Sequence, residues 1–313
     1  MGRQNAVPLI SVIVCSHNRA GFLDKAIGSL VRQSLDPELF EIILVDNGSI
    51  DETPALCRRR AAEIGNLIHI SEPKLGLSVA RNAGVARASG KYLAFLDDDA
   101  IACETWLEHI LEDFEAVEPR PGVVGGKVNP IWGIKRPSWL LDDLLGPLSV
   151  VDWSEERRPL RAREWVIGAN LALPRKLLLE CGGFPEGLGR RGAHLLSGAE
   201  TAVIRKIRNR GETVFYDPRA RVEHYIHPER LTRRWLFKRF FWGGVGSGIS
   251  AVEQATGAAE RRSLVMRRLS RLLNIGSLIK IAFPSKKKTR VHRICKKCSQ
   301  AGFLYGALIR AKE

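Results

Sequence analysis

The sequence predicts an α/β fold built on a mixed, mainly parallel β-sheet, and two observations lead to this prediction. Four uninterrupted apolar runs rich in β-branched residues alternate with segments whose apolar residues recur at helical spacing. Runs that are apolar throughout are typical of strands buried on both faces, and strands that alternate with helices are typical of parallel sheets. Ligands bind such sheets beyond the carboxyl ends of the strands, so the residues that close each run are the first candidates for function.

Strands and helices follow one another regularly over the first third of the chain. Strands are predicted within residues 9–19, 40–49, 66–71 and 91–100, and helices within residues 22–34, 51–65, 76–90 and 103–114. Three strands close on polar groups, at Cys15 to Arg19, at Asp46 to Ser49 and at Asp97 to Asp99. These groups are expected to meet at one edge of the sheet.

From Gly122 onward the pattern changes to shorter strands. They are predicted within residues 122–128, 164–173, 213–218 and 221–226, as a mixed continuation of the same sheet. The loop near residues 130–160 contains Trp132, Trp139 and Trp153, whose rings either anchor the loop or contact a ligand. Beyond Pro228 the chain is mostly helical, and the glycine-rich segment at residues 243–248 is interpreted as a break between helices.

Charge is distributed unevenly along the 313 residues. Residues 1–225 hold 29 basic and 30 acidic side chains, a net charge of −1, whereas residues 226–313 hold 20 and 4, a net charge of +16. A protein that binds nucleic acid through its main domain would carry the excess charge there, so no nucleic-acid partner is expected. The basic last part needs a separate explanation.

Other classes of protein are also excluded. The apolar run Leu9 to Cys15 is shorter than the core of a secretory signal, so the mature chain is expected to begin at or near Met1. No uninterrupted apolar stretch is long enough to span a bilayer. Six widely spread cysteines favour a reducing cytosol. Cys295 and Cys298 form a single CxxC, which is more typical of two small helix residues than of a zinc site.

Three adjacent carboxylates, Asp97, Asp98 and Asp99, follow an apolar strand. Adjacent carboxylates repel one another unless a cation or strong hydrogen-bond donors neutralise them. Mg²⁺ and Mn²⁺ prefer carboxylate oxygens and often also hold a substrate's phosphates, so the cluster predicts a divalent cation that bridges to a diphosphate. The alternative is a solvated acidic turn that caps the helix within residues 103–114.

Six segments occur in a characteristic order: SVIVCSHNR, ILVDNGSIDET, GLSVARNAGVARASGKYLAFLDDDA, GANLALPR, GGFPEGLG and LLSGAET. With them the chain resembles the family 2 glycosyltransferases of GT-A fold. The resemblance implies a GT-A domain at residues 8–240, with a nucleotide-sugar-binding half at 8–105 and an acceptor half at 120–225, and a basic amphipathic helical tail at 241–313. It implies inverting transfer of a sugar from a nucleotide-sugar donor to an acceptor hydroxyl.

The resemblance also implies roles for residues of the donor half. Asp46 is expected to accept a hydrogen bond from a pyrimidine, which favours a UDP-sugar. Cys15 is expected to line the base and ribose, at a position where the family often has threonine. Arg81 matches a donor-site arginine, and Asp98 is expected to face the ribose. Side-chain preferences alone leave open that Asp46 only forms a turn and that Arg81 lies on a solvated helix face.

The implied metal site contains the DxD pair, Asp97 and Asp99, with His224 near it, and the ion is Mn²⁺ or Mg²⁺. A cation there would stabilise the charge on a diphosphate leaving group. Imidazole complements carboxylates as a ligand for such ions, although a partly buried histidine without a ligand role is about as frequent. His227 is a weaker candidate.

Inversion requires a base on the face of the sugar opposite the leaving group. The family places an acid there, often within Gly-Glu-Asp, whereas this chain has Ala199 at the first acidic position and Glu200 at the second. Glu200 is therefore expected to be the general base. Ser197 and Glu200 also have the spacing of a helix capping box, which is compatible with that role. Ala199 leaves open a catalytically impaired module that binds nucleotide-sugars or glycans.

Residues 257–313 are predicted to form two or three basic amphipathic helices. Their apolar residues fall close to one stripe, with basic residues off it: Val265, Leu269, Leu272, Ile279 and Phe283, against Arg267, Arg268, Arg271 and Lys280. Such helices favour an anionic membrane surface. The tail therefore predicts attachment to the cytoplasmic face of a membrane. The family resemblance implies a glycan or lipid-linked glycan as the acceptor, in polysaccharide or glycan synthesis. The alternatives are a solvated helical hairpin packed on the body and a partly disordered tail.

Two other enzyme classes with similar sheets do not fit. A nucleotidyltransferase typically has a glycine-rich phosphate loop after its first strand, and CSHNRAG is not one. A dinucleotide-dependent dehydrogenase has G-x-G-x-x-G at that place, and the GGVGSG at residues 243–248 has neither the spacing nor a preceding strand.

Overall fold

The structure is a computed structural model that describes residues 7–190, 195–282 and 287–310, and the chain divides into two compact units. Unit 1 takes its described residues from 1–131, 149–186 and 199–225. Unit 2 takes them from 132–148, 187–198 and 226–313.

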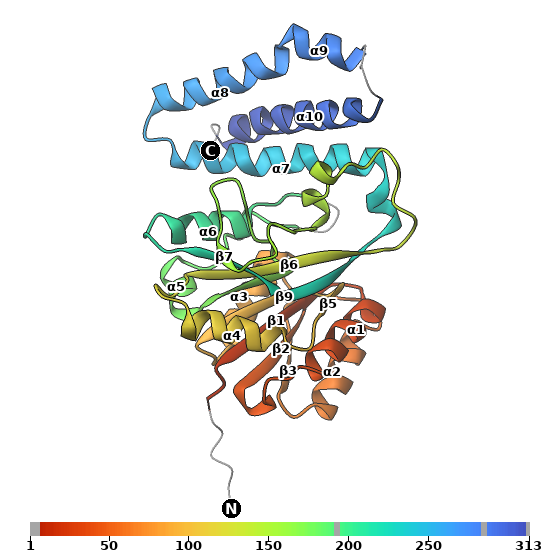
Figure 1. The fold of residues 1–313 in the computed structure, drawn as a ribbon, viewed down its shortest axis with the longest axis vertical. Helices are drawn as coiled ribbons and strands as arrows, with labels where there is room; N and C mark the ends of the chain where they lie inside the picture. Colours follow the sequence, from red (N-terminus) through yellow and green to blue (C-terminus); the bar gives the residue numbers. More distant parts are fainter. Residues whose placement is uncertain (1–6, 191–194, 283–286, 311–313) are drawn as a thin grey trace, which may run out of the picture. The chain divides into compact units, whose positions relative to one another are not determined.

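Unit 1 is built on a nine-stranded sheet of described residues (Figure 1). The strands are β1 (Ile10–Ser16), β2 (Phe40–Asp46), β3 (Leu67–Ser71), β4 (Tyr92–Asp97), β5 (Ala100–Ala102), β6 (Val123–Trp132), β7 (Arg158–Pro159), β8 (Asn170–Pro174) and β9 (Val214–Ile226). The helices are α1 (Ala20–Val31), α2 (Thr53–Glu63), α3 (Leu77–Arg87), α4 (Trp106–Ala116), α5 (Arg175–Glu180) and α6 (Ala199–Arg208), with a 3₁₀ turn, η1 (Pro37–Leu39).

The strand order is β3-β2-β1-β4-β8-β6-β9-β5, with β7 beside β9. Strands β3, β2, β1 and β4 pair in parallel, whereas β8 is antiparallel to both β4 and β6. The parallel register sets Ser16 against Asp46 and Cys15 against Asp97. The predicted α/β class and the meeting of polar strand ends at one edge are therefore confirmed.

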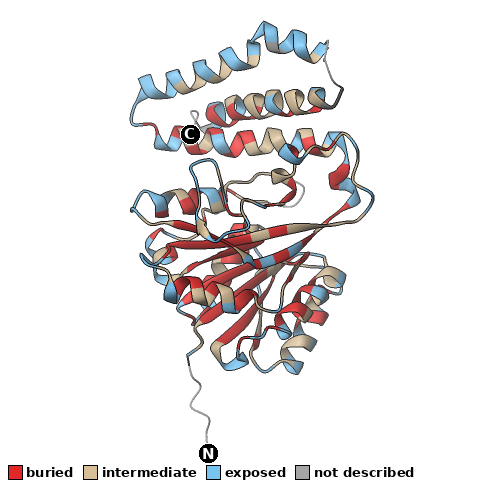
Figure 2. Ribbon diagram, viewed as in Figure 1, coloured by how far each residue is buried: buried red, intermediate tan, exposed pale blue. Residues whose placement is uncertain are grey.

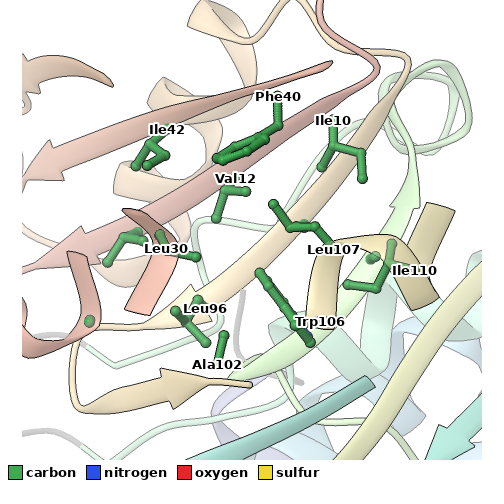
Figure 3. Packing of buried hydrophobic residues seen from close by; sticks show 14 of the residues in the cluster. Ile10, Val12, Leu30, Phe40, Ile42, Leu96, Ala102, Trp106, Leu107 and Ile110 are labelled. Atoms are coloured by element: carbon green, nitrogen blue, oxygen red, sulfur yellow. The ribbon is translucent and has the colours of Figure 1, made fainter. Parts of the chain in front are cut away.

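Both faces of the parallel strands are covered, as their continuous apolar sequence requires. On one face, alternate residues of β1, β2 and β4 form the largest core with α1, α2 and α4; Figure 3 shows Val12, Leu30, Phe40 and Trp106 in that cluster. On the other face α3 lies so close to β1 that a Cβ on Gly84 would approach a methyl of Ile13 to 2.6 Å. Figure 2 shows the strands as the most continuously buried part of the unit.

Several strands of unit 1 differ from the prediction. The strand predicted within residues 164–173 begins only at Asn170, as β8, and β5 and β7 were not predicted. The segments predicted as separate strands within residues 213–218 and 221–226 form the single strand β9. Its first half pairs with β7 through Tyr216 and its second half with β5 through His224. Pro218, at which the first of the two predicted strands ended, lies inside β9 between these two pairings.

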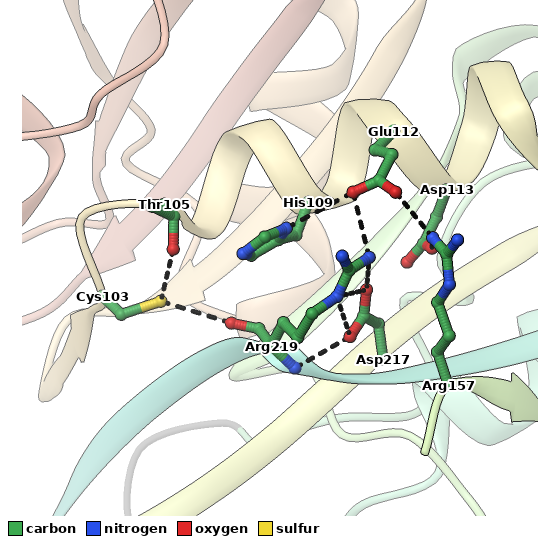
Figure 4. A network of polar contacts seen from close by, with 8 residues as sticks. All are labelled: Cys103, Thr105, His109, Glu112, Asp113, Arg157, Asp217 and Arg219. Carbon is green, nitrogen blue, oxygen red and sulfur yellow. Dashed lines mark hydrogen bonds and ion pairs between the residues drawn. The ribbon is translucent and has the colours of Figure 1, made fainter. Parts of the chain in front are cut away.

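A partly buried network of carboxylates and arginines joins α4 to β9 (Figure 4). Arg219 pairs with Asp217 at 2.7 Å and with Glu112 at 3.0 Å, and Arg157 pairs with Glu112 at 2.8 Å. Asp113 is fully buried, and its carboxylate oxygens have no hydrogen-bond partner among the described residues. Burial, together with the charge of Asp217 and against the charges of Arg219 and Arg157, raises the pKa of Asp113 to about 8.

This carboxyl predicts a pH-dependent stability that Asp113→Asn should remove. The unfolded chain loses the proton near pH 4, at the ordinary carboxyl pKa of about 3.9, whereas the folded chain keeps it up to about pH 8. Within that window the folded state binds more protons, so its stability falls as the pH rises. Thermal melts from pH 5 to pH 8 should show a smaller fall in Tm for the variant. Glu155→Gln, which changes an exposed carboxylate, is the control. Parallel profiles for wild type and Asp113→Asn would contradict the prediction.

Unit 2 is mainly helical. Its helices are α7 (Arg233–Gln254), α8 (Ala258–Leu273), α9 (Ile275–Ala282) and α10 (Lys287–Arg310), with the 3₁₀ turns η2 (Asp142–Leu144), η3 (Gly146–Leu148) and η4 (Pro228–Leu231). The predicted helical tail is thus confirmed, and α7 runs through the predicted boundary between residues 240 and 241. No helix of the described ranges has the length and apolarity that crossing a bilayer requires.

The glycine-rich segment at residues 243–248 does not break a helix, so that prediction was wrong. It lies inside α7, where α10 packs against it. A Cβ on Gly244 would collide with the carbonyl of Ser299, and one on Gly248 with the carbonyl of Phe303. These glycines therefore let the two helix backbones approach closely, which is a use of glycine that a turn signal does not distinguish.

The apolar stripe predicted for the tail is divided between the inside and the outside of unit 2. Val265 packs against a small core, and Leu269 and Leu272 are half-buried. Ile279 is exposed. Phe283 lies outside the described residues. So do residues 284–286, which begin the lysine- and arginine-rich segment PSKKKTRVHRICKK at 284–297. The core that receives Val265 consists of Val252, Phe303 and Ala307.

Candidate active site

Asp97, Asp99 and His224 come together at the ends of β4 and β9. Each offers one ligand atom, and these atoms lie within 4.8 Å of one another. Strand β5 follows Asp99 directly and pairs Ala100 with His224, which explains why residues so far apart in sequence meet. In the part of the chain that the structure describes this is the only such group, so Cys295 and Cys298 belong to none.

These three residues suit a divalent cation. Two carboxylates match the preference of hard divalent cations for oxygen ligands, and the imidazole adds a nitrogen ligand. His224 Nε2 lies 3.1 Å from Asp99 Oδ1 with both side chains buried, and Nδ1 of His224 is buried without a hydrogen-bond partner among the described residues. Burial raises the pKa of Asp98 to about 6, with the charge of Asp99 adding to the rise and the charge of Arg19 opposing it. Carboxylates so enclosed are not a solvated turn, so that alternative was wrong, and a cation would relieve their repulsion.

Arg19 and Ser16 also contact the acidic cluster, a role that the sequence motifs did not predict for them. Arg19 Nη1 lies 3.1 Å from Asp98 Oδ1 and 2.7 Å from Asp99 Oδ2. Ser16 donates a hydrogen bond to Asp98 Oδ2 at 2.8 Å. One signal in the sequence was available, since Ser16 and Arg19 belong to the polar group that closes β1. The parallel pairing sets Cys15 of that group against Asp97, at the start of the acidic cluster.

Arg81 of α3 connects this cluster to Glu200. Its Nη1 lies 2.6 Å from Glu200 Oε1, and its Nη2 lies 3.4 Å from Asp97 Oδ1. The Arg81 side chain is only 3% exposed, so the alternative of a basic residue on a solvated face was wrong. A Cβ on Gly168 would collide with both Arg81 and Glu200, and the absence of a side chain there makes room for the pair.

Aromatic rings enclose the guanidinium of Arg81. The group lies 5.4 Å from the ring centre of Phe184 and 5.9 Å from that of Phe95, and the two rings meet edge to face. Asn82, next in the helix, donates to the carbonyl of Phe184 at 2.8 Å and accepts from its N–H at 2.9 Å. The loop that carries Phe184 is therefore tied to α3, which holds Arg81 in one position.

Glu200 lies in the first turn of α6, where the helix dipole favours a carboxylate. The helix begins at Ala199, so Glu200 is its second residue, whereas a capping box places the acid third. Ala199 is 1% exposed. The family often has acidic residues at both positions. Here only the second position, Glu200, has a carboxylate, and this carboxylate pairs with Arg81.

Asp46 and Cys15, both predicted to contact the donor, lie at the carboxyl ends of the neighbouring strands β2 and β1. Asp46 is buried, and its Oδ1 accepts a hydrogen bond from the Ser49 N–H at 3.1 Å, so it does form the turn that was the alternative reading. The side chain of Asn47 donates to the carbonyl of Glu72 and accepts from the N–H of Gly76, which fixes the loop after β3. Burial, against the charge of Arg81, raises the pKa of the Cys15 thiol to about 12, so this thiol is neutral and not a nucleophile.

Comparison with known proteins finds relatives that are named glycosyltransferases. A family model described as glycosyl transferase family 2 matches residues 11–164. The chain is 28% identical over 244 residues to the glucosyl-dolichyl phosphate glucuronosyltransferase of Haloferax volcanii, covering 75% of each protein. The chain is also 28% identical over 208 residues to the validoxylamine A glucosyltransferase of Streptomyces hygroscopicus subsp. limoneus. That match covers 59% of this chain and 46% of the relative, which is less than half of the relative's length.

Solved structures show the same fold at low identity. The mannosyltransferase PcManGT from Pyrobaculum calidifontis, in complex with GDP-Man and Mn²⁺, matches with a TM-score of 0.61 and 18% identity over 98% of this chain and 88% of that one. Residues 1–349 of S. aureus TarS, in complex with UDP-GlcNAc, match with a TM-score of 0.56 and 14% identity over 96% and 92%. The curated relatives are named as transferases, so the chain is an enzyme that transfers glycosyl groups. Residues 11–164 match glycosyl transferase family 2, and the chain has the GT-A fold.

Proposed function

We propose that the chain transfers a sugar from a UDP-sugar to an acceptor hydroxyl with inversion. Glu200 is the general base, and Asp97, Asp99 and His224 would hold Mn²⁺ or Mg²⁺. The observation that carries the proposal is the buried guanidinium of Arg81, which pairs with Glu200 at 2.6 Å and with Asp97 at 3.4 Å. It sets the proposed base beside a proposed metal ligand, as a direct displacement requires.

The proposed reaction is a single displacement. The acceptor oxygen forms a bond to the anomeric carbon while the bond from that carbon to the diphosphate oxygen breaks, and Glu200 takes the acceptor's proton. A divalent cation, when bound, would stabilise the charge of the diphosphate as a Lewis acid. The Arg81 side chain is buried and paired with Glu200. In addition to its predicted donor-site role, we therefore propose that Arg81 positions Glu200.

The donor contacts are proposed for the ends of β1, β2 and β4. Asp46 would accept a hydrogen bond from the pyrimidine, Asp98 from a ribose hydroxyl, and Cys15 would line the base and ribose. The two solved structures above hold GDP-Man and UDP-GlcNAc, so nucleoside-diphosphate sugars of both kinds occur on this fold. We favour uridine because of Asp46, which is buried and pairs with Ser16 in the β1–β2 register.

The proposed acceptor is a glycan or lipid-linked glycan. The name of the Haloferax volcanii relative describes action on a sugar linked to dolichyl phosphate, which is a lipid. We therefore propose that the enzyme works at the cytoplasmic face of a membrane, in the synthesis of a polysaccharide or glycan.

A screen of nucleotide-sugars by thermal shift, with and without Mn²⁺, tests the donor and the metal together. A donor that binds the folded state raises Tm by mass action, and a UDP-sugar should do so only with the metal present. Turnover of that donor is then measured. A shift with GDP-sugars alone would contradict the choice of uridine, and no shift or turnover with any nucleotide-sugar would contradict the transfer itself.

Arg19→Gln is expected to raise the affinity for Mn²⁺ without donor about tenfold, because the Arg19 guanidinium is a positive charge beside Asp98 and Asp99. The electron paramagnetic resonance signal of free Mn²⁺ measures the affinity. Arg60→Gln is the control, since Arg60 is equally exposed and pairs with Asp24 at 2.6 Å. An unchanged or weaker affinity in Arg19→Gln would show that Arg19 does not oppose metal binding.

A further inference from the structure

Five large aliphatic side chains of α8 and α9 are exposed on unit 2. Their exposed fractions run from 45% to 72%, and the five are Met266, Leu273, Ile275, Leu278 and Ile279. Met266 and Leu273 are seven residues apart on α8 and so share one side of the helix, and the other three follow directly on α9. We call this set the α8–α9 face.

The α8–α9 face points away from the rest of unit 2 because the opposite side of α8 is already occupied. Leu264 and Val265 pack against the core formed by α7 and α10. The guanidinium of Arg268 lies 4.5 Å from the ring centre of Phe303 on α10. In Figure 2 the outer side of α8 and most of α9 are exposed.

Helix α10 also fixes both helices by their carboxyl ends. Lys297 donates hydrogen bonds to the carbonyls of Arg271 and Leu272 at the end of α8, at 2.7 and 2.6 Å. Arg293 donates to the carbonyl of Lys280 near the end of α9 at 2.5 Å. Such contacts satisfy carbonyls that a helix end leaves without partners. The α8–α9 face is therefore a presented surface and not a frayed end.

Exposed basic residues lie on the same two helices, and acidic residues are nearly absent. Arg262, Arg267, Arg271 and Lys280 are exposed. The only acidic residue in 258–282 is Glu260, whose carboxylate accepts hydrogen bonds from the N–H and hydroxyl of Thr256. Burial, together with the charges of Arg271 and Arg267, lowers the pKa of Arg268.

We propose that the α8–α9 face docks on an anionic lipid bilayer, with the aliphatic side chains in the boundary between headgroups and acyl chains and the basic side chains on the lipid phosphates. Apolar residues between basic flanks are what an interfacial helix presents to such a surface. This inference goes beyond the transfer reaction and does not depend on it.

Two other occupants fit the same residues less well. Single-stranded nucleic acid is held by aromatic side chains on which bases stack, and residues 258–282 contain no aromatic residue. A second copy of the chain would bring Arg262, Arg267 and Arg271 against their own counterparts, and like charges across an interface are unfavourable. An anionic bilayer satisfies both the charge and the aliphatic side chains.

Vesicle flotation with the full chain tests the proposal. Vesicles of phosphatidylcholine with phosphatidylglycerol are compared with vesicles of phosphatidylcholine alone, and the wild type should float only with the first. Arg267→Ala with Arg271→Ala should weaken partitioning about 30-fold, since each basic side chain contributes about fivefold near an anionic leaflet. Leu278→Ser with Ile279→Ser should weaken it about tenfold or more. Lys176→Ala with Leu179→Ser, two exposed changes on α5, is the matched control and should float like the wild type.

Several results would overturn the proposal. The wild type could stay unbound with anionic vesicles, the Leu278 and Ile279 variant could float as well as the wild type, or these substitutions could instead dissociate a dimer or abolish binding to polyuridylate. Donor turnover is measured on the same preparations with a water-soluble acceptor. A wild type that turns over the donor but does not float with anionic vesicles overturns docking alone. A wild type that floats but does not turn over the donor overturns the transfer proposal alone.

Discussion

Glu200→Gln is expected to lower the rate of sugar transfer by about 10²- to 10⁴-fold, the range for loss of a general base. Glutamine keeps the shape of the side chain and an oxygen for Arg81, but it does not take a proton from the acceptor. Donor binding should persist, because the proposed donor contacts lie at the ends of β1, β2 and β4 and do not include Glu200. Steady-state transfer rates and donor-induced thermal shifts measure the two effects separately.

The control for this prediction is Glu164→Gln. Glu164 pairs with Arg158 at 2.8 Å and is 13% exposed, so the change also neutralises an arginine-bound carboxylate. It should lower Tm and leave the transfer rate within a few-fold of the wild type. Retention of most activity by Glu200→Gln would remove Glu200 as the base, and since Ala199 offers no carboxylate, the base would then have to come from another element.

The parallel half of the fold and the place of the site could be predicted because local pattern determines both. Apolar runs that end in polar residues specify β1, β2 and β4, and in-register parallel pairing brings their ends together. Strand β9 could not be predicted as one element, because Pro218 reads as an interruption whereas the pairings with β7 and β5 are contacts between distant segments.

Contacts between distant segments also decided what the sequence could not show within the site. Arg81 and Glu200 are 119 residues apart, and their pairing depends on the bare backbone of Gly168 between them. Arg19 follows β1 in sequence, yet its partners Asp98 and Asp99 follow β4. In the tail, helical spacing revealed an apolar stripe but not that Val265 faces α7 and α10 while Ile279 faces outward.

Asp99→Asn is expected to weaken Mn²⁺ binding about 100-fold and to lower the transfer rate about 100-fold or more. Asp99 is the more enclosed of the two proposed carboxylate ligands, with Oδ1 3.1 Å from His224 and Oδ2 2.7 Å from Arg19. The change should leave the fold intact, because the Asp99 carbonyl keeps its hydrogen bond from the N–H of Tyr225 at 2.9 Å. Titration calorimetry with Mn²⁺ and transfer rates at rising Mn²⁺ measure the two effects.

The comparison with Asp98→Asn separates a lost ligand from a lost charge. Asp98 bonds to Ser16 and Arg19 and is not one of the three grouped ligands, so its variant should keep Mn²⁺ affinity within a few-fold and raise the KM for the donor. Equal loss of Mn²⁺ affinity in both variants would mean that the cluster attracts the ion only by its total charge. High Mn²⁺ should restore part of the transfer rate in Asp99→Asn, since the base is still present, but none in Glu200→Gln, whose defect lies in proton removal. Restoration in both variants, or in neither, would break the division of roles between the metal ligands and Glu200.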